Sequence, residues 1–539
     1  MQELTLASGS LGNRSSGEEL RGDDVTKEDE TVVDSEQGSM LMHIISQLRP
    51  GADLSRVTLP TFILEPRSML ERITNFMAHP ETLLPMTKIE DPVERFVAVV
   101  KFYLSGWHIK PPGVKKPLNP ILGETFTCYW DYEDGTRGYY IAEQTSHHPP
   151  KSSYFFMAPE HHLRIDGTLK PRSKFLGNSA ASMMEGIAVM RFLNTNERFF
   201  ITQPNMYARG ILFGKMKYEL GDHSFVRCPE SGLAADLEFK TKGWVSGGYN
   251  AIGGFIKDTK TDTNLFELSG HWNAAMYIKN LTTGKKELLF DATHAKHTPP
   301  KTRPLEEQGE RESQRLWHEV TEAVKRKDQE VATEAKARIE DRQREEAAKR
   351  AQDDVDWHPS LFRPVHGGHG GTEEGEEDLD WIINAKIDGK TPQEQIKQIL
   401  HIAAILPGQA PPRHQFNIPS RRSSIARSRA SLESIRDTHH VGPDPQQQPS
   451  QHTPAHNTAA AAPVTIEGST HPAAHPSSSD TATPEPHNLS LRHEELLKAI
   501  PPSKLLHKNK HDEPVQGGDA LKRVDSETRS EDEFHDAES

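Results

Sequence analysis

The amino-acid sequence predicts a mainly β fold with some α-helix, in which many antiparallel strands form a large sandwich or barrel. Three observations lead to this class. Hydrophobic residues recur with period two from about residue 122 to 295, as in half-buried strands. Turn signals separate these runs and no helical patterns alternate with them, so the strands should be antiparallel. Helical patterns stand only before and after this region, where helices can cover a barrel mouth.

The segment before the strands starts with an acidic stretch. Residues 1–39 hold ten acidic and three basic residues, a net charge of −7, and almost no aromatic residues. Such a composition cannot bury enough apolar surface to order itself, so we expect a disordered tail. Three helices should follow. The first has an apolar stripe of Met40, Ile44, Ile45 and Leu48, the second covers RSMLERITNFMAHP, and Asp91 with Pro92 begins the third.

The strand region divides at its turn signals into many short runs, among them TFTCYWDY, GYYIAEQT, SYFFMA, GIAVMRFL and ERFFITQP. Its last part, FELSGHWNAAMYIKNLTTGKKELLFDA, predicts two long strands joined by a turn at Asn280–Gly284. A sheet of this size that closes into a barrel can enclose a ligand.

After the strands, residues 304–351 predict one long charged helical segment with room for one break. Thr391 as N-cap and Pro392 at the first position begin a shorter helix. From about residue 408 the chain is rich in Pro, Ser, Gln, His and Ala, as in linkers and tails. The predicted organisation is a disordered tail over 1–39, a folded domain over 40–370, a short helical extension over 371–406 and a second disordered tail over 407–539.

Composition excludes several classes of protein. The chain has 64 basic and 78 acidic residues, a net charge of −14, which argues against a general nucleic-acid binder. Two cysteines, Cys128 and Cys228, cannot build a disulfide framework or a thiolate zinc site. No apolar run has the length of a membrane helix, and no signal pattern stands at the start. We expect a soluble intracellular protein with peripheral membrane contact.

The octet Glu143–Pro150, EQTSHHPP, is the most distinctive local pattern. It ends a predicted strand, and its two prolines force an extended exit. Two adjacent imidazoles can donate hydrogen bonds to one polyanion. Surface histidines and a metal-ligand pair are the alternatives; neighbours on a strand point to opposite faces, so chelation by both is awkward. The residues alone leave these three interpretations open.

The octet resembles, at every position, the signature of oxysterol-binding-protein-related lipid transfer proteins. The resemblance extends over about residues 45–370 and includes KKPLNPILGE, GNSAA, LSGHWNA and DDVDWHPSLF. It is of the fungal type, a short form without a pleckstrin-homology domain. It implies a large, nearly complete antiparallel β-barrel that encloses a hydrophobic lipid tunnel, with amino-terminal lid helices and a long carboxyl-terminal helical segment. It also implies a protein that is not an enzyme and needs no cofactor or metal.

The resemblance also implies a site for the head group of phosphatidylinositol 4-phosphate at the tunnel mouth. Carried over to matching positions, the ligands are Lys116, Asn119, His147, His148, Lys336, Glu340 and Arg344. The last three are four residues apart, so in a helix they share one face over about 12 Å. The alternative is an ordinary solvated face of a charged helix. A phosphomonoester carries nearly two negative charges, which lysine, arginine and histidine donors can satisfy.

For a second lipid, LPTFILE resembles the branch of the family that carries phosphatidylserine. The resemblance implies that Leu59 contacts an acyl chain and that Thr61 and Ser173 bind the serine head group. The alternative is that this segment only packs the base of the lid. Leu118 departs from the aromatic residue common at this position in that branch, and sterol is the next candidate.

The carboxyl terminus, SEDEFHDAES, resembles the acidic-tract motif that docks on VAP proteins of the endoplasmic reticulum. Phe534 would be the aromatic anchor, Asp536 the acidic contact and Ala537 the small residue in a tight pocket. The alternative is a plain acidic tail. A basic segment, residues 421–437, is either an unstructured linker or a membrane-surface helix that phosphorylation would weaken.

These features together predict a lipid transfer protein that exchanges phosphatidylinositol 4-phosphate for a second lipid, phosphatidylserine first and sterol next, at membrane contact sites of the endoplasmic reticulum. The expected location is the cytoplasm, peripheral to these membranes. Two other classes stay open: a lipid-responsive scaffold or sensor without net transfer, and a lipid hydrolase, although no Gly-x-Ser-x-Gly motif is present.

Overall fold

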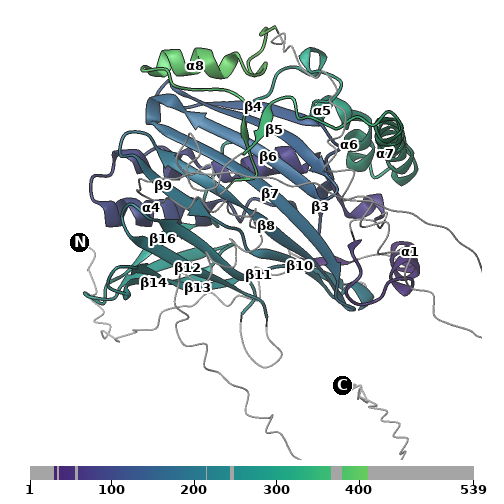
Figure 1. Cartoon of the computed structure of the whole chain (residues 1–539). Coiled ribbons are helices and arrows are strands. Elements are labelled where there is room, and N and C mark those ends of the chain that lie inside the picture. The colour runs from purple at the N-terminus through teal and green to yellow at the C-terminus, as the bar shows by residue number, and fades with distance from the viewer. Residues whose placement is uncertain are drawn as a thin grey trace, which may run out of the picture. The chain divides into compact units, whose positions relative to one another are not determined.

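A computed structural model describes residues 30–32, 35–54, 57, 59–213, 215–242, 248–365 and 379–410. Its main feature is one antiparallel sheet of 14 strands, in the order β16-β15-β14-β13-β12-β11-β10-β8-β7-β6-β5-β4 (Figure 1). Strand β9 also lies between β8 and β11, and β1 pairs with β11. The predicted mainly β fold class with antiparallel strands is thereby confirmed.

The strands of this sheet are β1 (Glu30–Val32), β4 (Thr125–Asp131), β5 (Arg137–His147), β6 (Pro150–Ala158), β7 (Leu163–Phe175), β8 (Ser179–Phe192), β9 (Glu197–Ile201), β10 (Asn205–Arg209), β11 (Lys215–Cys228), β12 (Leu233–Lys240), β13 (Ala251–Asp258), β14 (Thr263–His271), β15 (Ala275–Asn280) and β16 (Lys286–Asp291). Two small sheets accompany it, the parallel pair β2 (Leu64–Ser68) and β3 (Lys116–Leu118) and the antiparallel pair β17 (Phe362–Pro364) and β18 (Trp381–Ile383).

The helices are α1 (Ser35–Ser46), α2 (Met69–Arg72), α3 (Pro80–Leu83), α4 (Pro92–Ser105), α5 (Ser313–Leu316), α6 (His318–Lys325), α7 (Gln329–Gln352) and α8 (Pro392–Leu400). Short 3-10 turns are η3 (Thr61–Ile63), η4 (Ile73–Met77), η5 (Met86–Lys88), η6 (Pro159–His161), η7 (Ile211–Phe213) and η8 (Leu305–Glu307). Among the described residues, no helix is both long and apolar enough to cross a bilayer.

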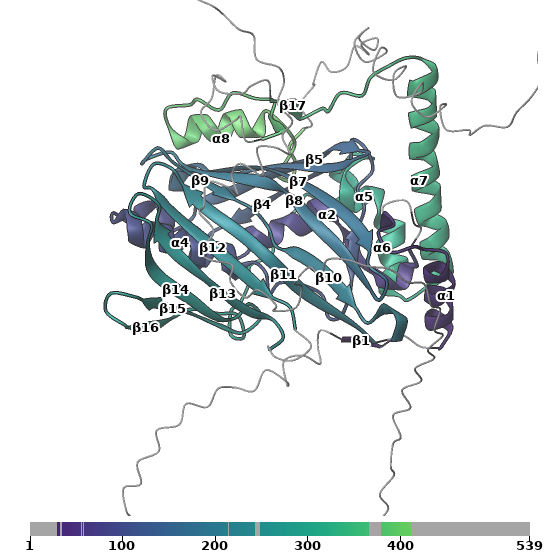
Figure 2. The same cartoon turned by 60° about the horizontal axis from the view of Figure 1, so that its bottom comes forward.

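Much of the space inside the curved sheet is filled by protein. Helix α4 runs there (Figure 2) and buries Phe96, Val99 and Tyr103 against strand residues such as Trp130 and Phe239. Asp91 caps this helix by accepting hydrogen bonds from the amides of residues 93 and 94, as the sequence predicts. The enclosed space available to a ligand is therefore confined to the other end of the sheet.

The structure corrects the predicted start of the folded part. Residues 1–39 were expected to be disordered, but Glu30–Val32 forms β1 and α1 begins at Ser35. Thr31 accepts a hydrogen bond from the amide of Val114 at 2.7 Å. Pairing with the exposed edge of β11 supplies the order that this acidic segment lacks by itself. In α1 the buried residues are Leu41 and Ile45.

Two predicted elements divide further than expected. The region from Phe266 to Ala292 forms three strands, because a turn over residues 272–274 separates β14 from β15. The charged segment after the sheet is broken both at Trp317 and before α7, where Lys327 has a positive φ of 60°. Asp328 then caps α7, so that α7 begins as a separate helix.

Described structure on both sides of the expected boundaries at 370 and 407 packs together. Strand β18 pairs with β17, and α8 packs its apolar face on the outer side of the sheet, where Ile399 and Ile405 contact Ile141 and Phe155 (Figure 1). Thr391 and Glu394 form the predicted capping box of α8. Gln409 still donates a hydrogen bond to the carbonyl of Leu400 at 2.5 Å. The extension is therefore part of the same folded body.

Candidate functional site

A cavity of about 280 Å³ lies between α1, the segment before β2, and strands β7, β8, β10 and β11. Aliphatic and aromatic side chains from these elements form most of its wall, and both α1 and α7 lie at this end of the sheet (Figure 2). The apolar lining includes Leu41, Ile45, Leu48, Leu59, Ile63, Phe175, Ala181, Met184, Met206, Ile211, Met216 and Tyr218. Such a wall can solvate a hydrocarbon chain.

Polar residues gather on one side of this cavity, and α7 brings some of them. Lys336 and Glu340 line the cavity and form an ion pair with Nζ and Oε1 2.5 Å apart. Arg344 lies one turn further along, with an exposed side chain that pairs with Asp341 and is 3.7 Å from Glu340. The three residues share one helix face as predicted, but Arg344 is not part of the cavity wall.

Strand β3 and the following turn bring Lys116 and Asn119 to the same side. Burial lowers the pKa of Lys116, the nearby ammonium of Lys336 lowers it further, and Glu340 and Asp53 oppose the shift. Within the described part of the chain, the Lys116 ammonium has neither a hydrogen bond nor an ion pair. Its neighbour Lys115 instead donates to the carbonyl of Phe62 at 2.6 Å.

His147 and His148 complete the group. Strand β5 ends at His147, so the alternation of side chains ends there too, and both rings line the cavity with their centroids 4.6 Å apart. His148 is exposed, whereas His147 is partly buried. Burial and His148 lower the pKa of His147 to about 4, so this ring is neutral near pH 7. Among described residues, no His, Cys, Asp or Glu cluster is placed to bind a metal.

Gln343 is a polar residue of this site that sequence reasoning missed. It stands on α7 between Glu340 and Arg344, and its side chain bridges the amide of Leu122 and the ring of His147, at 2.7 and 2.8 Å. A glutamine in a strongly charged helix gives no pattern that would single it out. Only the packing of α7 against the turn after β3 gives it a role.

The residues expected to hold a second lipid do not all reach the cavity. Leu59 and Ser173 line it. Thr61 does not: it is buried against the start of α7, where its hydroxyl donates to Oε1 of Gln329 at 2.5 Å and lies 3.3 Å from the hydroxyl of Thr333. The structure thus places the Thr61 hydroxyl against α7, where it joins η3 to this helix, and not in the cavity wall.

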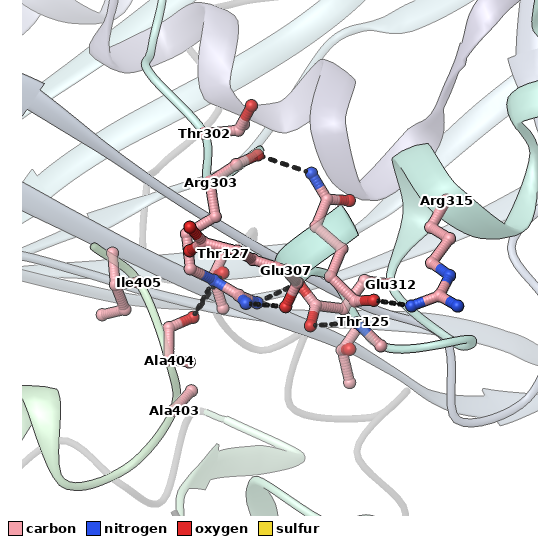
Figure 3. A network of polar contacts seen from close by, with 12 residues as sticks. Thr125, Thr127, Thr302, Arg303, Glu307, Glu312, Arg315, Ala403, Ala404 and Ile405 are labelled. Atoms are coloured by element: carbon pink, nitrogen blue, oxygen red, sulfur yellow. Dashed lines mark hydrogen bonds and ion pairs between the residues drawn. The ribbon is translucent and has the colours of Figure 1, made fainter. Parts of the chain in front are cut away.

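A buried arginine fixes the chain that leads to α7 (Figure 3). Arg303 is 3% exposed and pairs with Glu312; its guanidinium also donates to the carbonyls of Glu307 and Ala404, the latter at 3.1 Å. Thr127 of β4 donates to the same Ala404 carbonyl at 2.8 Å. The carboxyl-terminal extension thus braces the segment from which α5, α6 and α7 follow.

The predicted docking residues Phe534, Asp536 and Ala537, and the basic segment 421–437, lie outside the described residues. They stay predictions from the sequence.

A curved antiparallel sheet with an apolar cavity and cationic groups on one side of it defines a lipid-binding protein. Comparison with known proteins agrees. The family model described as Oxysterol-binding protein matches residues 43–327. Oxysterol-binding protein homolog 7 of Saccharomyces cerevisiae is 54% identical over 394 residues, which are 71% of this chain and 87% of that protein. The chain belongs to the oxysterol-binding protein family, whose members bind lipids and are not enzymes.

Solved structures share the fold. The Osh1 ORD domain in complex with cholesterol matches with a TM-score of 0.55 and 21% identity, covering 71% of this chain and 94% of that one. The Osh3 ORD of S. cerevisiae in complex with PI(4)P matches with a TM-score of 0.50 and 23% identity, covering 67% of this chain and 92% of that one.

Proposed function

We propose that this protein exchanges phosphatidylinositol 4-phosphate for a second lipid between the endoplasmic reticulum and another membrane. The observation that carries the proposal is the convergence of Lys116, Asn119, His147, His148 and Lys336 on one side of an apolar cavity. These residues come from three separate elements, and a solvated helix face would not produce this convergence. The PI(4)P-bound structure of a protein with the same fold supports it.

The chemistry of the group fits a phosphorylated inositol ring. A phosphomonoester carries between one and a half and two negative charges near neutral pH. The Lys116 ammonium has no competing anion in hydrogen-bond contact, so it is ready to receive one. Lys336 can turn from Glu340 to the phosphate, and the amide of Asn119 can donate to a phosphate oxygen or bind a ring hydroxyl. The apolar wall would hold the acyl chains.

Phosphatidylserine is the favoured second lipid and sterol the next. Leu59 and Ser173 both line the cavity, which places one apolar and one hydroxyl contact where a glycerophospholipid would lie. Thr61 does not line the cavity, so its position does not add to the argument for a serine head group. Since one cavity would hold either lipid, the two must exclude each other, and exclusion makes the exchange obligatory.

A transfer assay between two liposome populations tests the proposal. The wild-type protein should move phosphatidylinositol 4-phosphate one way and phosphatidylserine the other, each faster when the other is present. The double variant His147→Ala, His148→Ala should lose extraction of the phosphoinositide and still bind the second lipid. His318→Ala with His401→Ala removes two exposed histidines outside the cavity and serves as the control. Binding of both lipids without transfer would favour a sensor instead.

In this proposal the protein is peripheral to the endoplasmic reticulum, where Phe534, Asp536 and Ala537 would dock on a VAP protein.

A further inference from the structure

The hydrogen bonds of Gln343 determine the protonation of His147. A backbone N–H can only donate, so the Gln343 atom 2.7 Å from the amide of Leu122 is the side-chain oxygen. The other end of the amide, which faces Nε2 of His147 at 2.8 Å, is therefore the NH₂ group and donates. Nε2 must then be an acceptor without a proton.

The opposite side of the ring agrees with this assignment. Nδ1 of His147 lies 3.2 Å from the carbonyl of Pro120, and a carbonyl can only accept. The ring proton is therefore on Nδ1. Both nitrogens of His147 are engaged, and neither has a hydrogen to offer to an anion. Direct donation from this imidazole to a phosphate would require one of these two hydrogen bonds to break.

We propose that Gln343 is a positioning residue which holds His147 in its neutral Nδ1–H form, so that an anionic head group engages this ring only when the Gln343–His147 hydrogen bond opens and Nε2 takes up a proton from solvent. The step converts imidazole to imidazolium and breaks no covalent bond. The inference rests on the proposed function, since it requires a phosphomonoester at the cavity mouth.

The charged groups around the ring favour this sequence of events. His148, which follows β5, Lys116 of β3, and Lys336 and Arg344 of α7 bring positive charge to the site, while Glu340 brings a carboxylate near the ring. Burial is the main cause that lowers the pKa of His147 to about 4; His148 and Arg344 lower it further, and Glu340 opposes the shift. A phosphate dianion reverses the local field and stabilises the imidazolium. Binding at neutral pH should therefore be coupled to proton uptake.

Isothermal titration calorimetry measures this uptake without any variant. Dioctanoyl phosphatidylinositol 4-phosphate is titrated into the full-length protein at pH 7 in buffers of different ionisation enthalpy. The dependence of the observed enthalpy on the buffer gives the number of protons taken up, and we expect close to one per lipid. Dioctanoyl phosphatidylserine, which has no phosphomonoester, should bind with an uptake near zero.

The variant Gln343→Glu tests the role of the glutamine. Its carboxylate still accepts from Leu122 but also accepts from Nε2 of His147, so the ring should be protonated before the lipid arrives. The pKa of His147, measured by NMR on the empty protein, should rise well above the wild-type value, and uptake on binding should disappear. Gln352→Glu places the same charge at an exposed site near the end of α7 and should change neither quantity.

The possible failures can be told apart. If the phosphoinositide does not bind the wild-type protein, the proposed function is overturned and this inference with it. If it binds without proton uptake, or with the same uptake as phosphatidylserine, only the inference is overturned. Unchanged uptake in Gln343→Glu would remove the assigned role of Gln343.

Discussion

Replacing Lys116 by methionine should change ligand binding and stability in opposite directions. Methionine keeps the length and apolar character of the side chain and removes only the charge. Lys116 is partly buried near Lys336 and its ammonium has no hydrogen-bond partner among the described residues; loss of hydration is the main cause of its lowered pKa. The charge is thus unfavourable to the fold, and only an anionic ligand would compensate for it.

The magnitudes follow from these surroundings. A charge-assisted hydrogen bond contributes about 1.5–3 kcal/mol, so Lys116→Met should weaken binding of phosphatidylinositol 4-phosphate by about 10- to 150-fold. Replacement of an unpaired, incompletely hydrated charge by an apolar side chain removes the cost of taking that charge out of water. The free energy of unfolding of the empty protein should therefore rise in the variant. This gain should shrink as the pH approaches about 10.4, where the unfolded chain also loses the proton.

The assay combines lipid extraction from vesicles with urea unfolding of lipid-free protein at pH 7 and pH 10. Lys115→Met is the matched control, because the neighbouring ammonium donates to the Phe62 carbonyl. Removing it should lower stability by about 1–3 kcal/mol. A Lys116→Met protein that is less stable than wild type, or that binds the phosphoinositide equally well, would refute the reasoning.

Three further predictions concern other parts of the chain. Leu59→Asp should reduce loading of phosphatidylserine by roughly 100-fold, since it places a charge in the cavity wall; Leu193→Asp, at an exposed position, is the control, and normal loading would contradict the role of Leu59. Burial raises the pKa of Glu143 to about 7, so the folded protein keeps a proton that the unfolded chain releases near pH 4.5. Stability should therefore fall by up to about 3 kcal/mol as the pH rises between these values, and Glu143→Gln should flatten this slope in urea unfolding; a slope like that of wild type would count against it. Phe534→Ala should release the protein from the endoplasmic reticulum in cells while Phe416→Ala does not, and reticular localisation of the first variant would disprove the docking motif.

The sequence predicted those features that local chemistry determines. Period-two patterns identified the strands, Asp91 and Thr391 marked helix starts, and the spacing of Lys336, Glu340 and Arg344 placed them on one helix face. Features that depend on distant partners were not predictable. Strand β1 is ordered by pairing with an edge of β11. The sequence around Arg303 likewise gives no sign that its buried guanidinium binds the carbonyl of Ala404, about one hundred residues away.

The same limit applies to the site. A threonine in LPTFILE can face a cavity or a helix, and which one it meets depends on where α7 lies. Gln343 has no signal of its own because its importance comes from two partners, Leu122 and His147, that are far away in the sequence. Sequence patterns therefore indicate which residue types are available for binding, while tertiary packing decides which of them have free hydrogen-bonding groups.

The ion pairs of α7 at this site affect how easily a tightly bound lipid is released. Lys336 pairs with Glu340, and Arg344 pairs with Asp341, so two of the three cations expected to bind the head group have a carboxylate partner within the protein. When the phosphate dissociates, Lys336 and Arg344 are not left unpaired, because Glu340 and Asp341 pair with them again. Only Lys116 loses its partner. If all three cations were unpaired, the site would bind the head group more strongly. The dissociation rate of the lipid would then be too low for transfer. Glu340 is thus better understood as the group that returns to Lys336 when the lipid departs than as a contact for the phosphate itself.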